Sequence, residues 1–162
     1  MNTVVLLTGG NLSDRLSILR DAEDMIRKNI GPILSESPII ESEAWGFESK
    51  QAFLNQVLIV ETEYSALEIL DKTQEIEINL GRARKKEQWV SRIIDIDILF
   101  FNDEIIKTDL LTIPHKSIQA RRFTLLALNY VLKDYIHPVL GESIQQLLLE
   151  CKDKLKSDIY HA

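Results

Sequence analysis

Two aspartates separated by one residue follow a strongly basic segment, and this pairing is the part of the sequence most able to do chemistry. Residues 82–92 hold five basic side chains and one acidic one, so the segment carries +4 in a chain of net charge −6. All other residues therefore sum to −10. Paired carboxylates favour a divalent cation, whereas clustered Arg and Lys favour an oligophosphate. A magnesium–nucleotide complex satisfies both, so the pattern indicates an enzyme of phosphate chemistry.

The two aspartates, Asp95 and Asp97, alternate with isoleucine, which predicts a strand. Side chains two apart leave the same face of a strand, with Cα atoms about 6.6 Å apart. Ile94, Ile96 and Ile98 would then point to the other face, toward the helices. Unpaired carboxylates repel each other, and two magnesium ions roughly 3.5–4 Å apart would remove that repulsion and activate phosphoryl oxygens. For Asp-x-Asp alone a solvated outer strand face is the favoured explanation, and only the preceding basic segment reverses the balance toward a metal site.

The basic segment has a plain alternative, because a run of charge between elements is usually a solvated loop. Trp89 fits that alternative poorly, since an indole among cations is suited to covering a planar ligand or closing a lid. Arginine holds phosphate oxygens bidentately and keeps its charge, as phosphoryl transfer requires. The cationic side chains in question are Arg82, Arg84, Lys85, Lys86 and Arg92.

Three further features carry weaker signals. Phe53 and Asn55 share one face of a predicted strand, where a ring could stack on a heterocycle and an amide could read its edge, although a core Phe and a strand-end Asn are as compatible. His115 follows Pro114 at a predicted helix start, and a lone histidine is more often a structural hydrogen-bonding residue. The Gly9-Gly10 pair after a strand is only a weak phosphate-loop signal.

Composition indicates one compact domain spanning residues 1–162, with 45% hydrophobic residues and a pI of about 5.1. The acidic balance argues against nucleic-acid and membrane-surface binders. The single cysteine, Cys151, excludes an internal disulfide, and no stretch approaches the roughly 20 apolar residues of a membrane span. We therefore expect a cytoplasmic monomer that acts on small molecules and binds neither nucleic acid nor membrane.

Hydrophobic periodicity predicts the order β-α-β-β-α-β, followed by C-terminal helices. Expected strands cover 4–7, 33–41, 53–61 and the segment up to residue 101, with a short strand at 104–106. A helix capped by Ser13 and ending at Gly31, and another opened by a capping box at Ser65, separate them. Later helices are expected near 122–132 and after a second capping box at Ser143 and Gln146. The predicted fold class is α+β: a ferredoxin-like antiparallel sheet in two layers, with helices on one face.

Together these residues form a pattern that resembles the 6-hydroxymethyl-7,8-dihydropterin pyrophosphokinase family of folate biosynthesis. The main match is Gly81-Arg82-x-Arg84-x4-Trp89-x2-Arg92-x2-Asp95-x-Asp97-Ile98-Leu99-Phe100. Supporting matches are Gly10-Asn11-Leu12-x-Asp14-Arg15, Gly46 with Phe53-Leu54-Asn55, and Pro114-His115 with Arg121-x-Phe123. The resemblance covers roughly residues 4–150.

The resemblance implies transfer of pyrophosphate from ATP, the co-substrate, to the pterin hydroxymethyl group, with release of AMP. It implies that Asp95 and Asp97 hold two Mg²⁺ ions and that Arg82 and Arg92 are catalytic. The pterin-binding residues that it implies are Ser42, Glu43, Ala44, Trp45, Gly46, Phe53, Asn55, Trp89 and Phe123. The implied ATP-binding residues are Gln74, Glu77, Arg84, Lys85, Trp89, Arg92, Ile98, Thr112, His115 and Arg121.

Some positions depart from the family pattern. Gly10 stands where Ser is usual, residues 42–46 replace a more proline-rich version, and Lys116 replaces a frequent aromatic or proline.

Two alternative functions belong to other classes: a non-catalytic ferredoxin-like module that binds a small molecule, and a metal nuclease or nucleotidyltransferase. Magnesium dependence of nucleotide binding separates the first from the pyrophosphokinase, and a shift assay separates the second.

Overall fold

The computed structural model describes residues 1–43, 51–81 and 93–161. Their elements, in chain order, are β1 (Asn2–Gly10), α1 (Arg15–Asn29), β2 (Ile33–Glu36), β3 (Ile40–Ser42), β4 (Phe53–Thr62), α2 (Ala66–Asn79), β5 (Asp95–Phe101), β6 (Ile106–Lys107), β7 (Thr112–Ile113), the 3-10 helix η1 (Ile118–Ala120), α3 (Arg122–Leu132), α4 (Ile144–Glu150) and β8 (Ser157–Ile159). No helix within these described ranges has the length and apolar character needed to cross a bilayer.

The main sheet is antiparallel, as predicted, and has the order β5-β1-β4-β3-β8, with β2 also paired to β4. The predicted strand over 33–41 is divided into β2 and β3. The interruption falls at Ser37-Pro38, because proline has no N–H to donate to a ladder. The Ser37 hydroxyl accepts a hydrogen bond from the backbone N–H of Val57 at 2.9 Å and so keeps the chain attached to β4. Because the structure divides one predicted strand into two, the ferredoxin-like order of elements stays a prediction.

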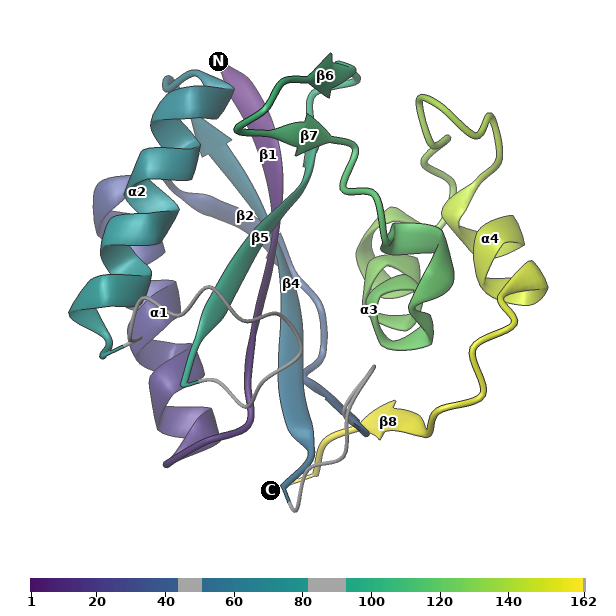
Figure 1. The fold of residues 1–162 in the computed structure, drawn as a ribbon, viewed down its shortest axis with the longest axis horizontal. Coiled ribbons are helices and arrows are strands. Elements are labelled where there is room, and N and C mark those ends of the chain that lie inside the picture. Colours follow the sequence, from purple (N-terminus) through teal and green to yellow (C-terminus); the bar gives the residue numbers. More distant parts are fainter. Residues whose placement is uncertain (44–50, 82–92, 162) are drawn as a thin grey trace.

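The two-layer prediction is wrong, because helices cover both faces of the sheet. Helices α1 and α2 lie on one face, and α3 and α4 lie on the other (Figure 1). The reason is visible in β1, where the seven residues from Val4 to Gly10 are all buried, and a strand with two apolar faces must be covered on both. Two cores result. The first core lies under α1 and α2, and the second core lies under α3 and α4.

Helix starts show where local sequence decided the structure. Ser65 and Glu68 form the predicted capping box of α2, each side chain bonding to the other residue's backbone N–H. Helix α1 is capped by Asp14, whose carboxylate accepts from Ser17 N–H, and not by Ser13, which has a positive φ of 58°. At α4 the Ser143 half of the box forms, but the Gln146 side chain donates to Glu150 instead.

Two predictions for the segment after β5 are corrected. The short strand expected at 104–106 is β6, which begins at Ile106 and pairs with β7. His115 does not begin a helix, since the first helical turn after it starts at Ile118. The Ile113–Pro114 peptide bond that precedes His115 is cis. His115 therefore lies in an irregular connection between the two-stranded sheet of β6 and β7 and the helices η1 and α3.

Candidate active site

Antiparallel register gathers the predicted site residues at one end of the sheet. Asp95 at the start of β5 is opposite Gly9 near the end of β1, and Gly9 is opposite Asn55 near the start of β4. Asn55 is in turn opposite Ile40 of β3. Directly opposed residues share a face of the sheet, so this row places an acid and an amide on the same side with only a glycine between them.

The acid pair shares one face of β5, as its spacing predicts, and this face is turned toward α3, while Ile96 and Ile98 are buried in the first core on the other face. The predicted two-layer fold would leave this face open, and that consequence is wrong, since the second core occupies the same face two residues further along, at Leu99. Asp95 and Asp97 are half-buried, and the Asp97 side chain is 27% exposed. They therefore lie at the margin of the second core and stay partly exposed.

Glu77 of α2 positions the backbone between the two acids. Its side chain is buried, and its carboxylate accepts a hydrogen bond from the N–H of Ile96 at 2.8 Å. In the sheet that the described residues form, β5 is an edge strand, so its outer N–H groups have no neighbouring strand to donate to. Glu77 accepts from one of them, the N–H of Ile96. The contact fixes the direction in which Asp95 and Asp97 point. The implied role of Glu77 toward ATP stays a prediction.

A β-bulge brings His115 to the acid pair. Leu99 and Phe100 both face the second core, and the β1–β5 register shifts at this point. The Leu99 carbonyl then accepts from the backbone N–H of His115 at 3.0 Å. His115 Nε2 lies 3.9 Å from Asp97 Oδ2. His115 Nδ1 accepts from Ser117 N–H at 3.2 Å, so the ring proton is on Nε2, facing the carboxylate.

His115 is uncharged at neutral pH. Burial lowers the pKa of His115 to about 4; the Arg121 charge also lowers this pKa, while Asp95 raises it. The contact with Asp97 is therefore a long polar contact and not an ion pair. Arg121 and Asp95 therefore both act electrostatically on the same imidazole, one from the start of α3 and the other from β5.

We expect the metal-free protein to lose stability in acid through His115. Its pKa is about 4 in the folded protein and 6.5 for an unperturbed histidine, so between these values the unfolded chain binds more protons, and stability falls as pH falls. The contribution is up to about 3 kcal/mol. Urea unfolding at pH 7 and pH 4, in a chelator, should show a smaller pH difference for His115→Asn than for wild type. An equal difference in both proteins would contradict the assignment.

Asn55 and Ser42 form the amide side of the site. Asn55 is 5% exposed and Ser42 is 2% exposed, and Asn55 Nδ2 donates to Ser42 Oγ at 3.2 Å. The Asn55 side chain packs directly over Gly9, where an added Cβ would lie 2.1 Å from Asn55 Oδ1. Phe53 starts the same strand on the same face, and Phe123, half-buried in the first turn of α3, packs on the second core. One face of β4 thus presents a ring and an amide two residues apart.

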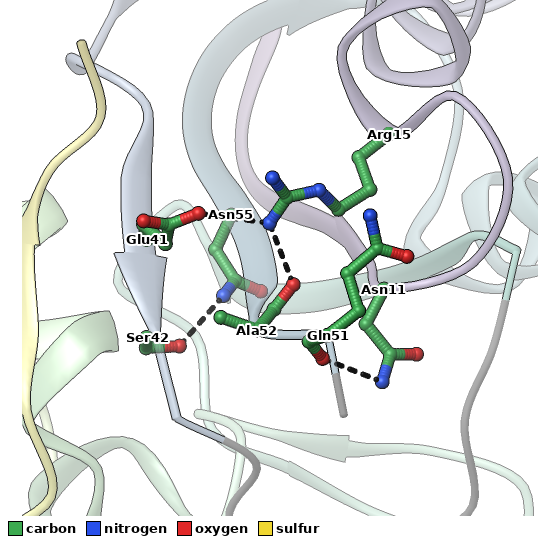
Figure 2. A network of polar contacts seen from close by, with 7 residues as sticks. All are labelled: Asn11, Arg15, Glu41, Ser42, Gln51, Ala52 and Asn55. Carbon is green, nitrogen blue, oxygen red and sulfur yellow. Dashed lines mark hydrogen bonds and ion pairs between the residues drawn. The ribbon is translucent and has the colours of Figure 1, made fainter. Parts of the chain in front are cut away.

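A polar network centred on Arg15 of α1 supports the amide side of the site (Figure 2). Arg15 Nη1 donates to Glu41 Oε2 at 2.9 Å and to the carbonyl of Ala52 at 2.8 Å. Buried Asn11 donates to the carbonyl of Gln51 at 3.2 Å. With its amide oriented to satisfy both neighbours, Gln51 donates to the Asn11 carbonyl and accepts from Arg15 Nε. The start of α1 thus holds the end of β3 and the start of β4 together.

Comparison with known proteins agrees with this arrangement of groups. The profile of the family described as 7,8-dihydro-6-hydroxymethylpterin-pyrophosphokinase matches residues 5–133. The chain belongs to this family. It is accordingly an enzyme, a pyrophosphokinase of folate biosynthesis, as the sequence predicted. The alternative of a non-catalytic binding module is thereby set aside.

Individual relatives carry the same description. The 2-amino-4-hydroxy-6-hydroxymethyldihydropteridine pyrophosphokinase of Aquifex aeolicus is 36% identical over 146 residues, which cover 90% of each chain. The protein with this description from Porphyromonas gingivalis is 38% identical over 141 residues, 85% of this chain and 95% of its own. The wild-type HPPK-DHPS structure of Plasmodium falciparum with pterin and p-hydroxybenzoate aligns with a TM-score of 0.75 at 22% identity, over 92% of this chain and 43% of that one. This last likeness shows the fold.

The remaining predicted residues are placed unevenly. Gln74 on α2 and Thr112 on β7 are exposed, whereas the Ile98 side chain is buried in the first core, so only its backbone could contact a nucleotide. Glu43, directly after β3, is exposed. The predicted residues Ala44, Trp45, Gly46, Arg82, Arg84, Lys85, Trp89 and Arg92 lie outside the residues that the structure describes.

Sequence reasoning missed two contributions to the site. Gly9 is not part of a turn or phosphate loop, since it pairs within β1 and gives Asn55 its space. Arg15 stood out only as part of a family motif, and its contacts join three segments far apart in sequence. The signal for Gly9 was available, because a glycine that ends an apolar strand often marks a close approach by another group. The partners of Arg15 depend on tertiary structure alone.

The acid pair fits magnesium by its donor chemistry. Magnesium is bound by hard oxygen ligands, commonly one or two protein carboxylates with substrate phosphates and water completing the shell. Asp95 and Asp97 offer such a pair on one face of one strand. Across the described parts of the chain, no group of three or more His, Cys, Asp or Glu side chains is placed to hold an ion.

Proposed function

We propose that the enzyme transfers the terminal pyrophosphoryl group of ATP to the hydroxymethyl group of 6-hydroxymethyl-7,8-dihydropterin, giving the pterin diphosphate and AMP. The observation that carries this proposal is the row formed by Asp95, Gly9 and Asn55. It places an acid that could hold a cation on the same face of the sheet as an amide that could pair with a heterocycle. Family membership supplies the reaction class, and the row supports the proposed arrangement of the two substrates.

In this proposal the pterin ring lies against the amide side of the site. The Asn55 amide and the backbone near Ser42 would pair with the edge of the heterocycle, while Phe53 and Phe123 would contact its faces. Held there, the hydroxymethyl oxygen would be directed toward Asp95 along the row. The benefit is positional, since a hydroxyl fixed near the β-phosphorus no longer reacts as a freely diffusing molecule.

The hydroxymethyl oxygen would attack the β-phosphorus in line, forming one P–O bond as the bond to the α-phosphate oxygen breaks. The hydroxyl proton passes to solvent, and AMP leaves with the bridging oxygen and the electron pair of the broken bond. Asp95 and Asp97 would hold two Mg²⁺ ions, which when bound supply Lewis acidity to the phosphoryl oxygens. Neutral His115 would donate its Nε2–H to the triphosphate beside Asp97. Arg82 and Arg92 would contact the charge that develops on the phosphates.

On the nucleotide side, the proposal keeps the residues implied by the resemblance. Exposed Gln74 and Thr112, the Ile98 backbone and Arg121 would contact ATP, together with Arg84 and Lys85. Trp89 would close over the site. The contribution of Glu77 is supported as an indirect one, because its carboxylate already accepts from Ile96 N–H.

The identity of the released nucleotide tests the proposal. With ATP, Mg²⁺ and the reduced pterin, we expect AMP and pterin diphosphate to form in equal amounts. AMP release should stop when either the pterin or magnesium is left out. Chromatography of the nucleotides at several times measures this directly. Release of ADP, or turnover that does not need the pterin, would overturn the proposal.

A further inference from the structure

The segment after α4 contacts both sides of the candidate site. We call residues 151–160 the C-terminal strap. It begins beside the first turn of α3 and ends as β8, which pairs with β3 and extends the main sheet (Figure 1). The strap lies beyond residues 5–133, where the family profile matches.

One end of the strap holds the start of α3. Asp153 Oδ2 accepts from the backbone N–H of Arg122 at 3.0 Å, and Asp153 Oδ1 accepts from Leu155 N–H at 2.9 Å. The Arg122 guanidinium donates in turn to the carbonyls of Asp153 and Cys151, both at 2.8 Å. Arg122 is the first residue of α3 and directly precedes Phe123. These contacts fix the helix start that carries one predicted ring contact.

The other end of the strap holds β3. Ser157 is opposite Ser42 in the β3–β8 ladder, and Ser42 is the partner of the Asn55 amide. Glu43 Oε1 accepts from Lys156 N–H at 2.9 Å, and Glu43 N–H donates to the Lys156 carbonyl at 3.1 Å.

Tyr160 continues this attachment toward α1. Its N–H donates to the Ile39 carbonyl at 2.8 Å. Its ring lies beneath the Arg15 guanidinium, whose carbon is 5.7 Å from the ring centre. The same arginine contacts Glu41 and Ala52, so the strap is joined to the polar network that supports the amide side.

We propose that the C-terminal strap is a positioning element that sets the separation between the start of α3 and the Ser42–Asn55 pair. Only three residues lie between Asp153 and Ser157, so this part of the strap spans at most roughly 14 Å. It therefore limits how far the wall carrying Phe123 can move from the wall carrying Asn55. The proposal rests on the proposed function, because these walls bind the substrate ring in that scheme.

The test loosens each end of the strap separately. Asp153→Ala removes both carboxylate acceptors at the α3 end while keeping the two backbone carbonyls that accept from Arg122, and Tyr160→Leu removes the aromatic ring beneath Arg15. Each variant should raise KM for the reduced pterin by about fivefold to tenfold while leaving KM for ATP near the wild-type value. Tyr160→Phe keeps the ring and should restore the wild-type KM. Asp158→Asn, on the exposed side of the same strap, is the matched control and should have no effect.

The double variant distinguishes a spacer from two independent contacts. If either loosened end already frees the walls, Asp153→Ala with Tyr160→Leu should resemble the worse single variant, whereas independent contacts would give multiplied effects. Multiplied effects, equal changes in both KM values, or wild-type pterin KM in folded single variants would each overturn the proposal. Circular dichroism establishes folding. Wild-type enzyme that forms no pterin diphosphate would instead refute the proposed function.

Discussion

Asp97→Asn is expected to lower kcat/KM by about 10³-fold, because the substitution keeps the size of the side chain but removes the charge that binds the cation. Lewis-acid stabilisation of a phosphoryl transition state is worth several kcal/mol, and each 1.36 kcal/mol is tenfold in rate. The neighbouring His115 is uncharged at neutral pH, so its imidazole cannot take over the role of the lost cation. Steady-state rates across a magnesium titration measure the effect.

The matched control is Asp109→Asn, an exposed acid in the turn between β6 and β7. It should leave rate and magnesium dependence unchanged, which excludes a general effect of removing one negative charge. The thermal unfolding midpoint of Asp97→Asn should stay close to that of wild type, so that lost activity is not lost folding. A folded Asp97→Asn enzyme with a wild-type magnesium response would show that this acid does not hold the cation.

The sequence correctly predicted that Asp95 and Asp97 share one face of a strand, because the signal for it is local. Alternation along one strand places Asp95 and Asp97 on the same face, whatever that strand packs against. The capping box at Ser65 was likewise correct, since both partners lie within one helical turn. Residues whose interactions span a few positions are the ones that pattern reasoning handles reliably.

The layer prediction failed for a different reason. Residues in β1 and β4 are buried on both faces, so the sheet needs a cover on both, and α3 and α4 supply the second one. The setting of the acids changed with it, from an open outer face to the margin of the second core. Periodicity identifies a face as apolar, and it does not say which distant element covers that face.

Contacts between distant segments were beyond the sequence altogether. The bulge at Leu99 that attaches His115, and the Arg15 contacts with Glu41 and Ala52, depend on register between strands. Register is a property of pairs of strands, and no single strand encodes it. The contacts of the C-terminal strap also join distant segments, because Asp153 bonds to α3 and Ser157 pairs with β3.

Gly9→Ala applies this reasoning to the pterin side, and we expect it to raise KM for the reduced pterin by about 10- to 100-fold. An added Cβ would lie 2.1 Å from Asn55 Oδ1 and 3.3 Å from the Leu54 carbonyl, so something must move. The Asn55 side chain is the movable group, and moving it breaks its hydrogen bond to Ser42. The acid pair lies across β1 and keeps its own strand contacts, so KM for ATP should change little.

A double variant separates this route from general damage to β1. In an Asn55→Gly background the amide is already gone and the space above Gly9 is open, so adding Gly9→Ala should cost almost nothing further. Thr3→Ala, at the exposed far end of the same strand, should leave both KM values unchanged. If Gly9→Ala raised the pterin KM equally with and without the Asn55 side chain, the effect would not pass through that amide. The close approach of Asn55 to β1 would then be a feature of packing alone.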